Sequence, residues 1–490
     1  MSNLDKINQL KQRKQKLKSQ DSVRTNISLL FDEGSFIELS AFVSKAVLTE
    51  GVVTGYGTID GRLVYLYAQD IDALGGAIGE ATTKKVSDTI DMAVKTGAPI
   101  IGILNSKGVR IDEGTNALCG IGGNLARAAK ASGVVPQITL VSGLCAGSAV
   151  FAAGLSDFTF MTEENSSIFL TGPVVTEGLT GVNTDAASLG GAKVCAEKGI
   201  AHFALNSDKE CISAIKKLLT FLPSNNLEGS PAYASDDDIN RLSQNIAELV
   251  PEDNSNYDIS QLISEVVDDG DVFEVSSAFA KAVFTGFAKL DGVSVGIVAN
   301  RPNHNEGFLD IDSSKKAASF IRTCDSFNIP IITFVDTPGF SAGIEQEHGG
   351  ISTYGAALIY AYAEATVPKI SVVVKRAFGN AYLAMGAKSV GADFAFAYPF
   401  AQISVLAPQT AAGILYNDEI SKADDPIAKR AEKTAEYADT TASPFTAVKN
   451  GFIDDVIDPL ETRQRLISAL DVLAAKRDER TPKKHGNMPV

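Results

Sequence analysis

Apolar runs alternate with amphipathic stretches along this chain, and the same order of runs occurs twice. Two apolar runs joined at an Asp-Gly pair occupy 54–70 and return at 285–301, which predicts a β-hairpin in each half. The stretches 82–93 and 312–325 are apolar about every three to four residues, as amphipathic helices are. The pattern therefore predicts an α/β fold built from an internal duplication.

A further pair of matching runs follows the helices. The apolar runs 98–108 and 329–339 each contain a proline near their start and end at glycine. Such continuous runs are typical of strands that are buried on both faces of a sheet. Each half is therefore expected to contain strands that alternate with helices around a largely parallel sheet.

Each half then contains a small-residue elbow, by which we mean the turn between a buried strand and the helix that follows it. The first elbow contains Gly147 and Ser148, and the second contains Gly379, Asn380 and Ala381. Backbone N–H groups at a helix start lack intrahelical acceptors, and small side chains let a substrate approach them. Such an elbow can stabilise an oxyanion, although close packing of a helix on a strand would require the same small residues.

The segment 222–240 is rich in Ser, Asn, Pro and Asp and poor in apolar residues, which is typical of a linker. We therefore expect two domains, 1–250 and 251–490. Duplication alone would preserve the core pattern, so it does not by itself indicate a function. The small residues of the elbow match between the two halves, as the core pattern does, and this favours a functional role for the elbow.

Composition narrows the classes of function. The formal net charge of −15 argues against nucleic acid as a partner, because binding to phosphate backbones needs a basic face. Five scattered cysteines without a CxxC pair indicate reduced thiols in a cytosolic protein. The beginning of the chain is polar and lysine-rich, unlike a secretory signal, and no apolar run is long enough for a membrane helix. We therefore expect a cytoplasmic protein.

Several other chemistries are disfavoured by the motifs. The four histidines lie outside any metal-binding pattern, so we expect no metal site. The chain contains no GxSxG elbow, no phosphate-binding loop of the GxxxxGKS/T type and no GxGxxG after a strand. Ser148 has no histidine in a recognisable partner context, which argues against a nucleophilic serine. We interpret Asp336 as structural and His348 as a surface or loop residue.

Ordered blocks of sequence over nearly the whole chain carry a more specific signal. They include LFDEGSFIEL (30–39), EGVVTGYGTIDGRLVY (50–65), SGVVPQITLVSGLCAG (132–147), FNIPIITFVDTPGF (327–340) and TPKKHGN (481–487). On these blocks the chain resembles the carboxyltransferase subunits of biotin-dependent acyl-CoA carboxylases and decarboxylases, of the propionyl-CoA carboxylase β and methylmalonyl-CoA decarboxylase α type. The resemblance implies two tandem crotonase-like domains, which would account for the duplication.

The resemblance also implies an activity and its site residues. The activity is transfer of a carboxyl group between biotin on a separate carrier protein and a short-chain acyl-CoA of the methylmalonyl-CoA or propionyl-CoA class. By this resemblance, the amides of Gly147 and Ser148 hold the thioester carbonyl of the acyl-CoA, and those of Asn380 and Ala381 hold the ureido carbonyl of biotin. Further substrate-binding candidates are Lys107 and Arg110, which we expect near the phosphates of coenzyme A, together with Gly379 and Leu383.

The partners follow from the same resemblance. It implies a homo-oligomer, a hexamer, in which the first domain of one subunit meets the second domain of another. It further implies a biotin carboxyl carrier protein, and either a biotin carboxylase or a membrane decarboxylase subunit through which the protein would associate with a membrane. Leu383 and FLPSNN (221–226) resemble the decarboxylase branch, which we favour, although the direction of transfer and the acyl group stay open.

Two alternatives remain beside this interpretation. Lys107, Ser148, Tyr354 and Asn380 stand where the family usually has other residues, so a non-catalytic or regulatory paralogue is the main alternative. A biotin-independent crotonase-type hydrolase or isomerase is the other alternative. It would need an Asp or Glu base near an elbow, and none is evident.

Overall fold

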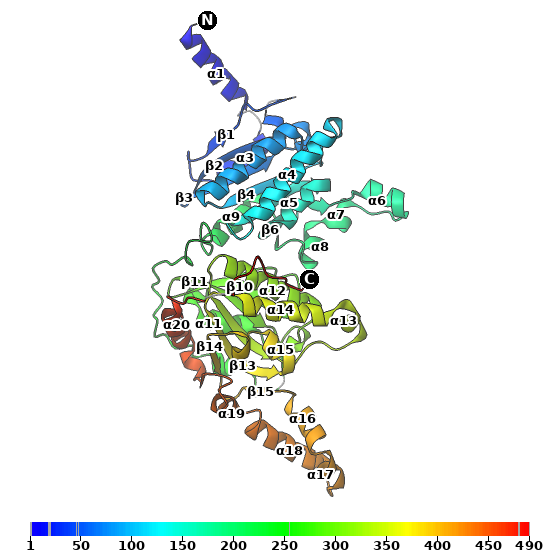
Figure 1. Cartoon of the computed structure of the whole chain (residues 1–490), viewed down its shortest axis with the longest axis vertical. Helices are drawn as coiled ribbons and strands as arrows, with labels where there is room; N and C mark the ends of the chain where they lie inside the picture. Colours follow the sequence, from blue (N-terminus) through cyan, green and yellow to red (C-terminus); the bar gives the residue numbers. More distant parts are fainter. Residues whose placement is uncertain are drawn as a thin grey trace. The chain divides into compact units, whose positions relative to one another are not determined.

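The computed structural model describes residues 2–17, 21–45, 47, 49–253, 255–478 and 481–489. Contacts divide the chain into two compact units, Met1–Glu228 (unit 1) and Gly229–Val490 (unit 2) (Figure 1). The division lies before the boundary expected near residue 250, because the intervening segment bonds to unit 2. The N–H of Tyr233 bonds the carbonyl of Gly292, and the N–H of Ser243 bonds that of Leu460. Its polar composition marks a linker, but does not tell which sheet the linker pairs with.

Unit 1 is built on an eight-stranded sheet in the order β1-β2-β3-β4-β5-β6-β8, with β7 beside β5. The first three strands are antiparallel, and β3 to β8 are parallel. The strands are β1 Ile37–Leu39, β2 Val52–Ile59, β3 Arg62–Gln69, β4 Ile100–Ser106, β5 Gln137–Ala146, β6 Phe158–Thr162, β7 Ser167–Phe169 and β8 Phe203–Leu205. The helices are α1 Asn3–Leu17, α2 Asp21–Leu30, α3 Glu80–Thr96, α4 Thr115–Ala131, α5 Val150–Gly154, α6 Pro173–Thr180, α7 Ala186–Gly190, α8 Ala192–Glu197 and α9 Asp208–Leu219.

Unit 2 repeats this topology with the order β9-β10-β11-β12-β13-β14-β16 and with β15 beside β13. Its strands are β9 Phe273–Glu274, β10 Val283–Leu290, β11 Val293–Asn300, β12 Ile331–Thr337, β13 Lys369–Phe378, β14 Phe394–Ala397, β15 Gln402–Ser404 and β16 Asp455–Val456. Its helices are α10 Ile246–Leu249, α11 Ile259–Val266, α12 Ile311–Ser326, α13 Ile344–Gly349, α14 Ile351–Glu364, α15 Gly379–Ala384, α16 Pro408–Leu415, α17 Asn417–Lys422, α18 Pro426–Thr440, α19 Pro444–Lys449 and α20 Thr462–Leu473. The predicted duplicated α/β fold is therefore confirmed.

Both predicted hairpins are present, and their turns explain the Asp-Gly pairs. Asp60 and Gly61 have φ of 51° and 75°, and Asp291 and Gly292 have φ of 48° and 74°. Two consecutive left-handed residues make a type I′ turn, whose twist matches that of the two strands it joins. Asp and Gly are among the residues that accept this backbone most readily.

The two amphipathic helices are also confirmed, as α3 and α12, and each of them buries one lysine. On α3, the Lys84 side chain is exposed, whereas Lys85 is only 1% exposed. The Lys85 ammonium donates to the carbonyl of Val52. Its counterpart Lys316 donates to the carbonyls of Phe279 and Val283, at 2.9 and 2.8 Å. A buried lysine is tolerated where carbonyls replace its water.

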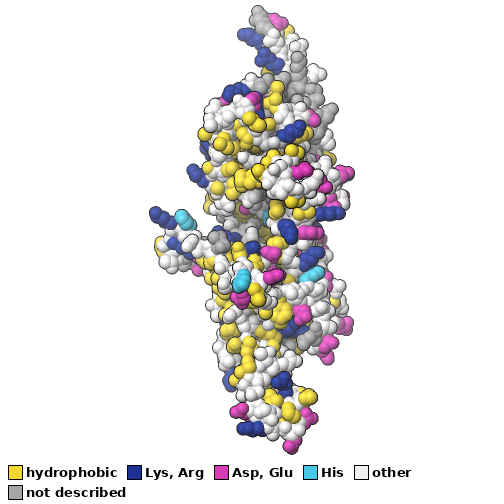
Figure 2. Space-filling model, turned by 90° about the vertical axis from the view of Figure 1, so that its right-hand side faces the viewer, with side chains coloured by type: hydrophobic (Ala, Val, Ile, Leu, Met, Phe, Trp, Pro, Cys, Tyr) yellow, Lys and Arg dark blue, Asp and Glu magenta, His cyan; other side chains and the backbone are white. Residues whose placement is uncertain are grey.

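The surface agrees with the acidic composition. On the face shown in Figure 2, Lys and Arg side chains are scattered among Asp and Glu side chains and form no stripe. Across the described residues, none of the helices has both the length and the apolar character that crossing a membrane requires.

Candidate functional site

The first elbow lies at the carboxyl end of β5, a central strand of unit 1. Gly147 has φ of 61°, a conformation that glycine adopts at little cost, and starts one turn of 3₁₀ helix that leads into α5 at Val150. Ser148 is half-buried, and Ala149 is buried. In open α/β sheets, ligands bind beyond the carboxyl ends of the strands, where this elbow is.

The second elbow repeats this geometry at the end of β13. Gly379 has φ of 58°, and α15 begins at this residue. A Cβ atom at Gly379 would lie 3.0 Å from the carbonyl oxygen of Val405, so space as well as conformation requires glycine here. Asn380 is exposed, Ala381 is buried, and Leu383 is half-buried on the same helix.

The two elbows thus share one backbone design. Each has a left-handed glycine followed by the N-terminal turn of a helix, where N–H groups have no intrahelical acceptor. Among the described residues, the left-handed non-glycine positions do not include Ser148 or Asn380, so these side chains replace glycine without backbone strain. Such a turn is suited to donate hydrogen bonds to an oxygen that carries negative charge.

The two cationic candidates, Lys107 and Arg110, both lie in the loop after β4, but their environments differ. Lys107 is exposed, whereas the Arg110 side chain is only 14% exposed and is surrounded by carboxylates. Its guanidinium lies 2.6 Å from Asp112, 3.0 Å from Glu113 and 3.4 Å from the buried Glu50. The hydrogen bond with Asp112, with help from the neighbouring negative charges, raises the pKa of Arg110. Lys107 is therefore the one of the two whose charge is available to an anion.

A buried ion pair supports the strand that bears the second elbow. Asp336, at the end of β12, accepts hydrogen bonds from Nε of Arg376 at 2.6 Å and from the hydroxyl of Tyr257 at 3.0 Å. Arg376 lies on β13 and also donates to the carbonyl of Glu306 at 3.0 Å. Burial, followed by the charge of Asp336, raises the pKa of Tyr257. The structural interpretation of Asp336 agrees with this network, but nothing in the local sequence identifies its distant partners.

A cavity of about 690 Å³ in unit 2 adjoins this ion pair. Its wall includes residues of β13, of the turn before β15, of β15 itself and of α16 and α18: Arg376, Phe378, Phe400, Gln402, Pro408 and Arg430. Phe378 and Phe400 are the aromatic residues of the lining, and charged side chains such as Glu252, Lys375 and Arg430 share it. No local sequence pattern predicts this cavity, because the residues that form it are far apart along the chain.

His202 lies in an apolar environment. His202 is buried against Phe158, its Nδ1 accepts the N–H of Thr159 at 3.0 Å, and burial lowers its pKa to about 4. Within the part of the chain that the structure describes, three or more His, Cys, Asp or Glu residues are nowhere grouped as metal ligands would be.

Comparisons with known proteins agree with this architecture. A family model described as the carboxyl transferase domain matches residues 14–488. The chain is 44% identical over 489 residues to methylmalonyl-CoA decarboxylase subunit alpha of Propionigenium modestum, covering 97% of this chain and 95% of that protein. It is 45% identical over 485 residues to the carboxyltransferase subunit of propionyl-CoA carboxylase of Haloferax mediterranei, covering 96% of this chain and 94% of that protein.

A solved structure provides an independent comparison. The hexameric transcarboxylase 12S, with methylmalonyl-coenzyme A and methylmalonic acid bound, superposes with a TM-score of 0.97 at 40% identity. The match covers 100% of this chain and 99% of that one. Because both the family model and this fold extend over essentially the whole sequence, the chain belongs to the carboxyl transferase family, as the sequence blocks had implied.

Proposed function

We propose that this protein transfers a carboxyl group between biotin on a separate carrier protein and a short-chain acyl-CoA of the methylmalonyl-CoA or propionyl-CoA class. The observation that carries this proposal is the pair of elbows with one backbone design, one in each unit. Proton abstraction next to a thioester and release of a carboxyl group from a ureido nitrogen both place negative charge on a carbonyl oxygen. This transfer therefore needs two sites that donate hydrogen bonds, one for each carbonyl oxygen.

The residues of the first elbow serve the acyl-CoA. The backbone N–H groups at Gly147 and Ser148 donate to the thioester oxygen and stabilise the negative charge that develops there when the α-proton leaves. This lowers the barrier without a side-chain base. The exposed Lys107 attracts a phosphate of coenzyme A, while Arg110 acts through its carboxylate partners by holding the loop after β4 in place.

The residues of the second elbow serve biotin. Biotin supplies the carboxyl group and a ring nitrogen that accepts the α-proton. The amides at Asn380 and Ala381 donate to its ureido oxygen, and Gly379 lets the backbone make the required turn. The adjoining cavity offers the rings of Phe378 and Phe400 beside polar side chains such as Gln402 and Arg430, a mixture that fits a ring system bearing a polar ureido group. Leu383 presents an apolar side chain beside this position.

We further propose a homo-oligomer, a hexamer, in which elbows of different subunits complete each site. Aliphatic side chains are exposed at equivalent places in the two units, on α6 and on α16. They are Val174, Val175, Leu179, Ile414 and Leu415. Apolar surface that a monomer would leave in water is typical of subunit interfaces. A monodisperse monomer in light scattering would contradict this assembly.

The other partners follow from the reaction. A biotin carboxyl carrier protein must deliver biotin, and a biotin carboxylase or a membrane decarboxylase subunit must load or unload it. The protein itself works in the cytoplasm, and in the decarboxylase branch it reaches the membrane only through its partner. Genes for these partners beside its own would separate the two branches.

The experiment that tests the activity is a transfer assay with the purified protein, a biotinyl carrier, and panels of acyl-CoAs and carboxyacyl-CoAs. We expect transfer with a three-carbon acyl group, in the direction that the partner subunits impose. Complete inactivity over both panels would favour the non-catalytic paralogue. Against that alternative stands the unstrained backbone of Ser148 and Asn380, which keeps their amides available.

A further inference from the structure

Near its end, strand β5 contains a bulge opposite a single residue of β4. The pairing register shifts between the two strands, so that Asn105 of β4 lies opposite the three residues 142–144 of β5. The same shift occurs in unit 2, where Asp336 of β12 lies opposite residues 374–376 of β13. Bulges are rare between parallel strands, and they often lie beside functional sites. The two units therefore share an unusual feature at equivalent places.

Each bulge is the point at which its strand changes neighbours. Strand β5 pairs with β6 as far as Val141 and with β7 from Leu144 onward. Strand β13 likewise pairs with β14 as far as Val373 and with β15 from Arg376 onward. The left-handed glycine of the elbow follows three residues later in both units. Because a bulge bends the strand that contains it, these bulges set the direction in which each elbow leaves its sheet.

The residue opposite each bulge closes it with a side-chain oxygen. Oδ1 of Asn105 accepts the N–H of Leu144 at 3.2 Å, and Oδ1 of Asp336 accepts the N–H of Arg376 at 3.2 Å. An N–H group in a sheet needs an acceptor, and a bulge interrupts the main-chain ladder that would otherwise provide one. We call Asn105 and Asp336 the bulge acceptors, because their side chains provide it instead.

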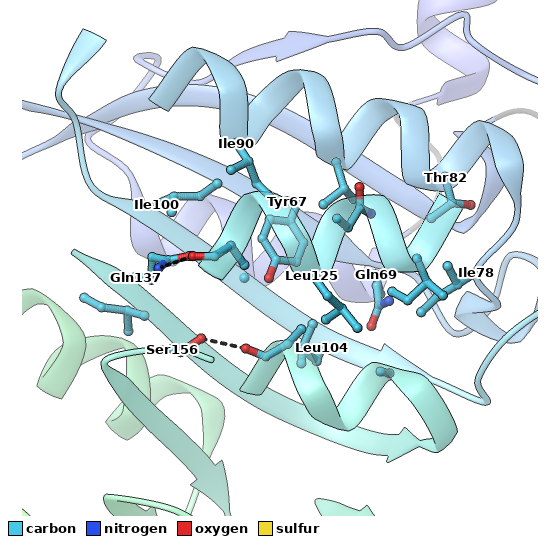
Figure 3. Close-up of a pocket in the computed structure, with 18 residues that line it drawn as sticks. Tyr67, Gln69, Ile78, Thr82, Ile90, Ile100, Leu104, Leu125, Gln137 and Ser156 are labelled. Atoms are coloured by element: carbon cyan, nitrogen blue, oxygen red, sulfur yellow. Dashed lines mark hydrogen bonds between the residues drawn. The ribbon is translucent and has the colours of Figure 1, made fainter. Parts of the chain in front are cut away.

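Both bulge acceptors are held from the preceding strand of the sheet. The N–H of Asn105 bonds the side-chain oxygen of Gln69 at 3.2 Å, and the N–H of Asp336 bonds that of Asn300 at 3.2 Å. Gln69 and Asn300 are the last residues of β3 and β11, and both are buried. Figure 3 shows Gln69 and Tyr67 together, where they line a small interior cavity of about 50 Å³ with residues of α3 and α4. In each unit, hydrogen bonds thus connect one strand end to the next and then to the elbow.

The chemistry of the two bulges differs. In unit 1 the acceptor is a neutral amide, and a Cβ atom at Gly143 would lie 2.6 Å from Oδ1 of Asn105, so the glycine makes room for it. In unit 2 the place of Gly143 is taken by Lys375, whose ammonium donates to main-chain carbonyls. There the acceptor is a carboxylate that also pairs with the guanidinium of Arg376. Each bulge can therefore be altered by substitutions that leave the other one intact.

We propose that Asn105 and Asp336 are positioning residues, each of which aims one elbow and so controls one of the two carbonyl sites of the transfer. The inference rests on the proposed function, in which the first elbow donates to the thioester oxygen and the second to the ureido oxygen. Each residue acts through the strand that carries the elbow, since its side-chain oxygen is engaged there. Backbone donors stabilise an oxyanion only when they point at it, so a changed bend lowers the rate although every donor is retained.

The test in unit 1 separates the acceptor oxygen from the volume of the side chain. Asn105→Leu removes the oxygen, Asn105→Asp retains one, and Gly143→Ala leaves Asn105 in place but takes the space of its amide. We expect kcat of transfer to fall about 100-fold in Asn105→Leu, to fall in Gly143→Ala as well, and to stay within about threefold of the wild type in Asn105→Asp. Asn124→Leu is the matched control, because this buried amide joins α4 to Ser87 of α3 rather than β4 to β5.

Hydrogen exchange followed by mass spectrometry gives a readout that does not depend on activity. In Asn105→Leu the amides of residues 144–149 should exchange about tenfold faster, whereas those of residues 376–381 should stay as in the wild type. A loss of stability alone would instead speed exchange throughout the sheet of unit 1.

The test in unit 2 uses two double variants that leave no buried charge unpaired. Asp336→Asn with Arg376→Leu reproduces the Asn105 and Leu144 pair of unit 1, and exchange in 376–381 should stay as in the wild type. Asp336→Leu with Arg376→Leu removes the acceptor oxygen and should speed exchange in that segment about tenfold. Both variants lack the guanidinium, so the difference between them reports the acceptor alone.

The outcomes separate this inference from the proposed function. If the folded wild type transfers nothing, the proposed function fails, and the exchange data alone decide whether the bulge acceptors fix the elbows. The inference is overturned if folded Asn105→Leu keeps wild-type transfer and wild-type exchange in 144–149. Gly143→Ala decides in the same way if Asn105→Leu does not fold. An equal loss of transfer in Asn105→Asp and Asn105→Leu would also overturn it, as would a loss of that size in Asn124→Leu.

Discussion

Asp32 and Asp268 hold equivalent positions in the two units, and each carboxylate accepts both N–H groups of its hairpin's Asp-Gly turn. The donors lie at 3.0 and 2.9 Å from Asp32, and at 3.0 and 2.7 Å from Asp268. The environments differ, because Asp268 is buried and lies 2.7 Å from the fully buried Arg463. Asp32 instead accepts a further hydrogen bond from Thr58 at 2.6 Å. Both units thus retain a turn clamp, by which we mean the carboxylate that accepts the two N–H groups of the hairpin turn, but the residues around the clamp differ.

The two clamps should differ in their contribution to stability. Asp268→Ala leaves the charge of Arg463 buried with only the more distant Asp237 nearby, at 3.7 Å, so we expect the free energy of unfolding to fall by about 3–5 kcal/mol. Asp32→Ala should cost less, because water can reach the freed turn. Urea unfolding of both variants at one protein concentration measures this. Equal losses would contradict the role assigned to Arg463.

Lys316 should make stability depend on pH. Burial lowers its pKa from the usual 10.5 to about 7, so between these values the unfolded chain binds more protons than the native protein. The free energy of unfolding should therefore rise with pH from about 7 toward 10. The same holds for Lys85, whose pKa burial lowers to about 8. In Lys316→Met the rise should be smaller, which urea unfolding at pH 7 and 9.5 tests.

The control for this prediction is Lys315→Met. Lys315 is the neighbour of Lys316 on α12, but its side chain is 42% exposed and lies over the ring of Tyr354. Its removal should leave the slope of stability against pH as in the wild type. An unchanged slope in Lys316→Met would show that this buried lysine titrates as an exposed one does.

Lys107 and Arg110 should respond differently to truncation. Lys107→Ala should weaken binding of coenzyme A several-fold at low salt and less at high salt, since an exposed charge is screened. Arg110→Ala should instead lower the free energy of unfolding by about 3 kcal/mol, because Glu50 is left buried without this partner. Calorimetric titration at two salt concentrations and urea unfolding separate the effects. Lys84→Ala, on the solvated face of α3, serves as the control for a general loss of positive charge.

The second elbow should work through its backbone. Asn380→Gly should keep transfer activity or raise it, because the amide is retained and an exposed side chain is removed. Ala381→Pro removes an N–H donor and should reduce transfer on the order of 100-fold. Binding of acyl-CoA should persist, since its donors are in unit 1. Normal transfer by a folded Ala381→Pro protein would refute the assignment.

The paired elbows also allow a test of the paralogue alternative. If the wild type is inert for a reason that lies outside the elbows, the double variant Ser148→Gly with Asn380→Gly should remain inert as well. Recovery of transfer in that variant would instead identify the protein as a paralogue that lost activity through the substitutions at its two elbows.

Local patterns were sufficient for the fold and for the elbows. The hairpins, the helices α3 and α12 and the strands β4 and β12 follow from the period of apolar residues and from Asp-Gly turns, which act over a few residues. The glycines at 147 and 379 were identifiable in the same way, because a left-handed turn restricts the residue type locally.

Contacts between distant residues were beyond those patterns. Arg376 reaches Asp336, which is 40 positions away, and the three carboxylates around Arg110 include Glu50, 60 positions away. A sequence in isolation shows a charge but not the partner that neutralises it. For that reason Lys107 and Arg110 looked alike in the sequence.

The sequence by itself determined that this protein is a duplicated α/β fold of a known family, with a glycine elbow in each half. Turn type, strand period and motif order depend on residues that are neighbours in the sequence, so they can be predicted from the sequence alone. Only the tertiary structure decided where an interior cavity is left and which charged side chains are buried or paired. The interior cavity of unit 1 beside Tyr67 is lined by residues of α3, α4 and β3 to β5, which lie far apart along the chain. Burial of Lys316 and pairing of Arg110 likewise depend on elements that meet only when the chain has folded.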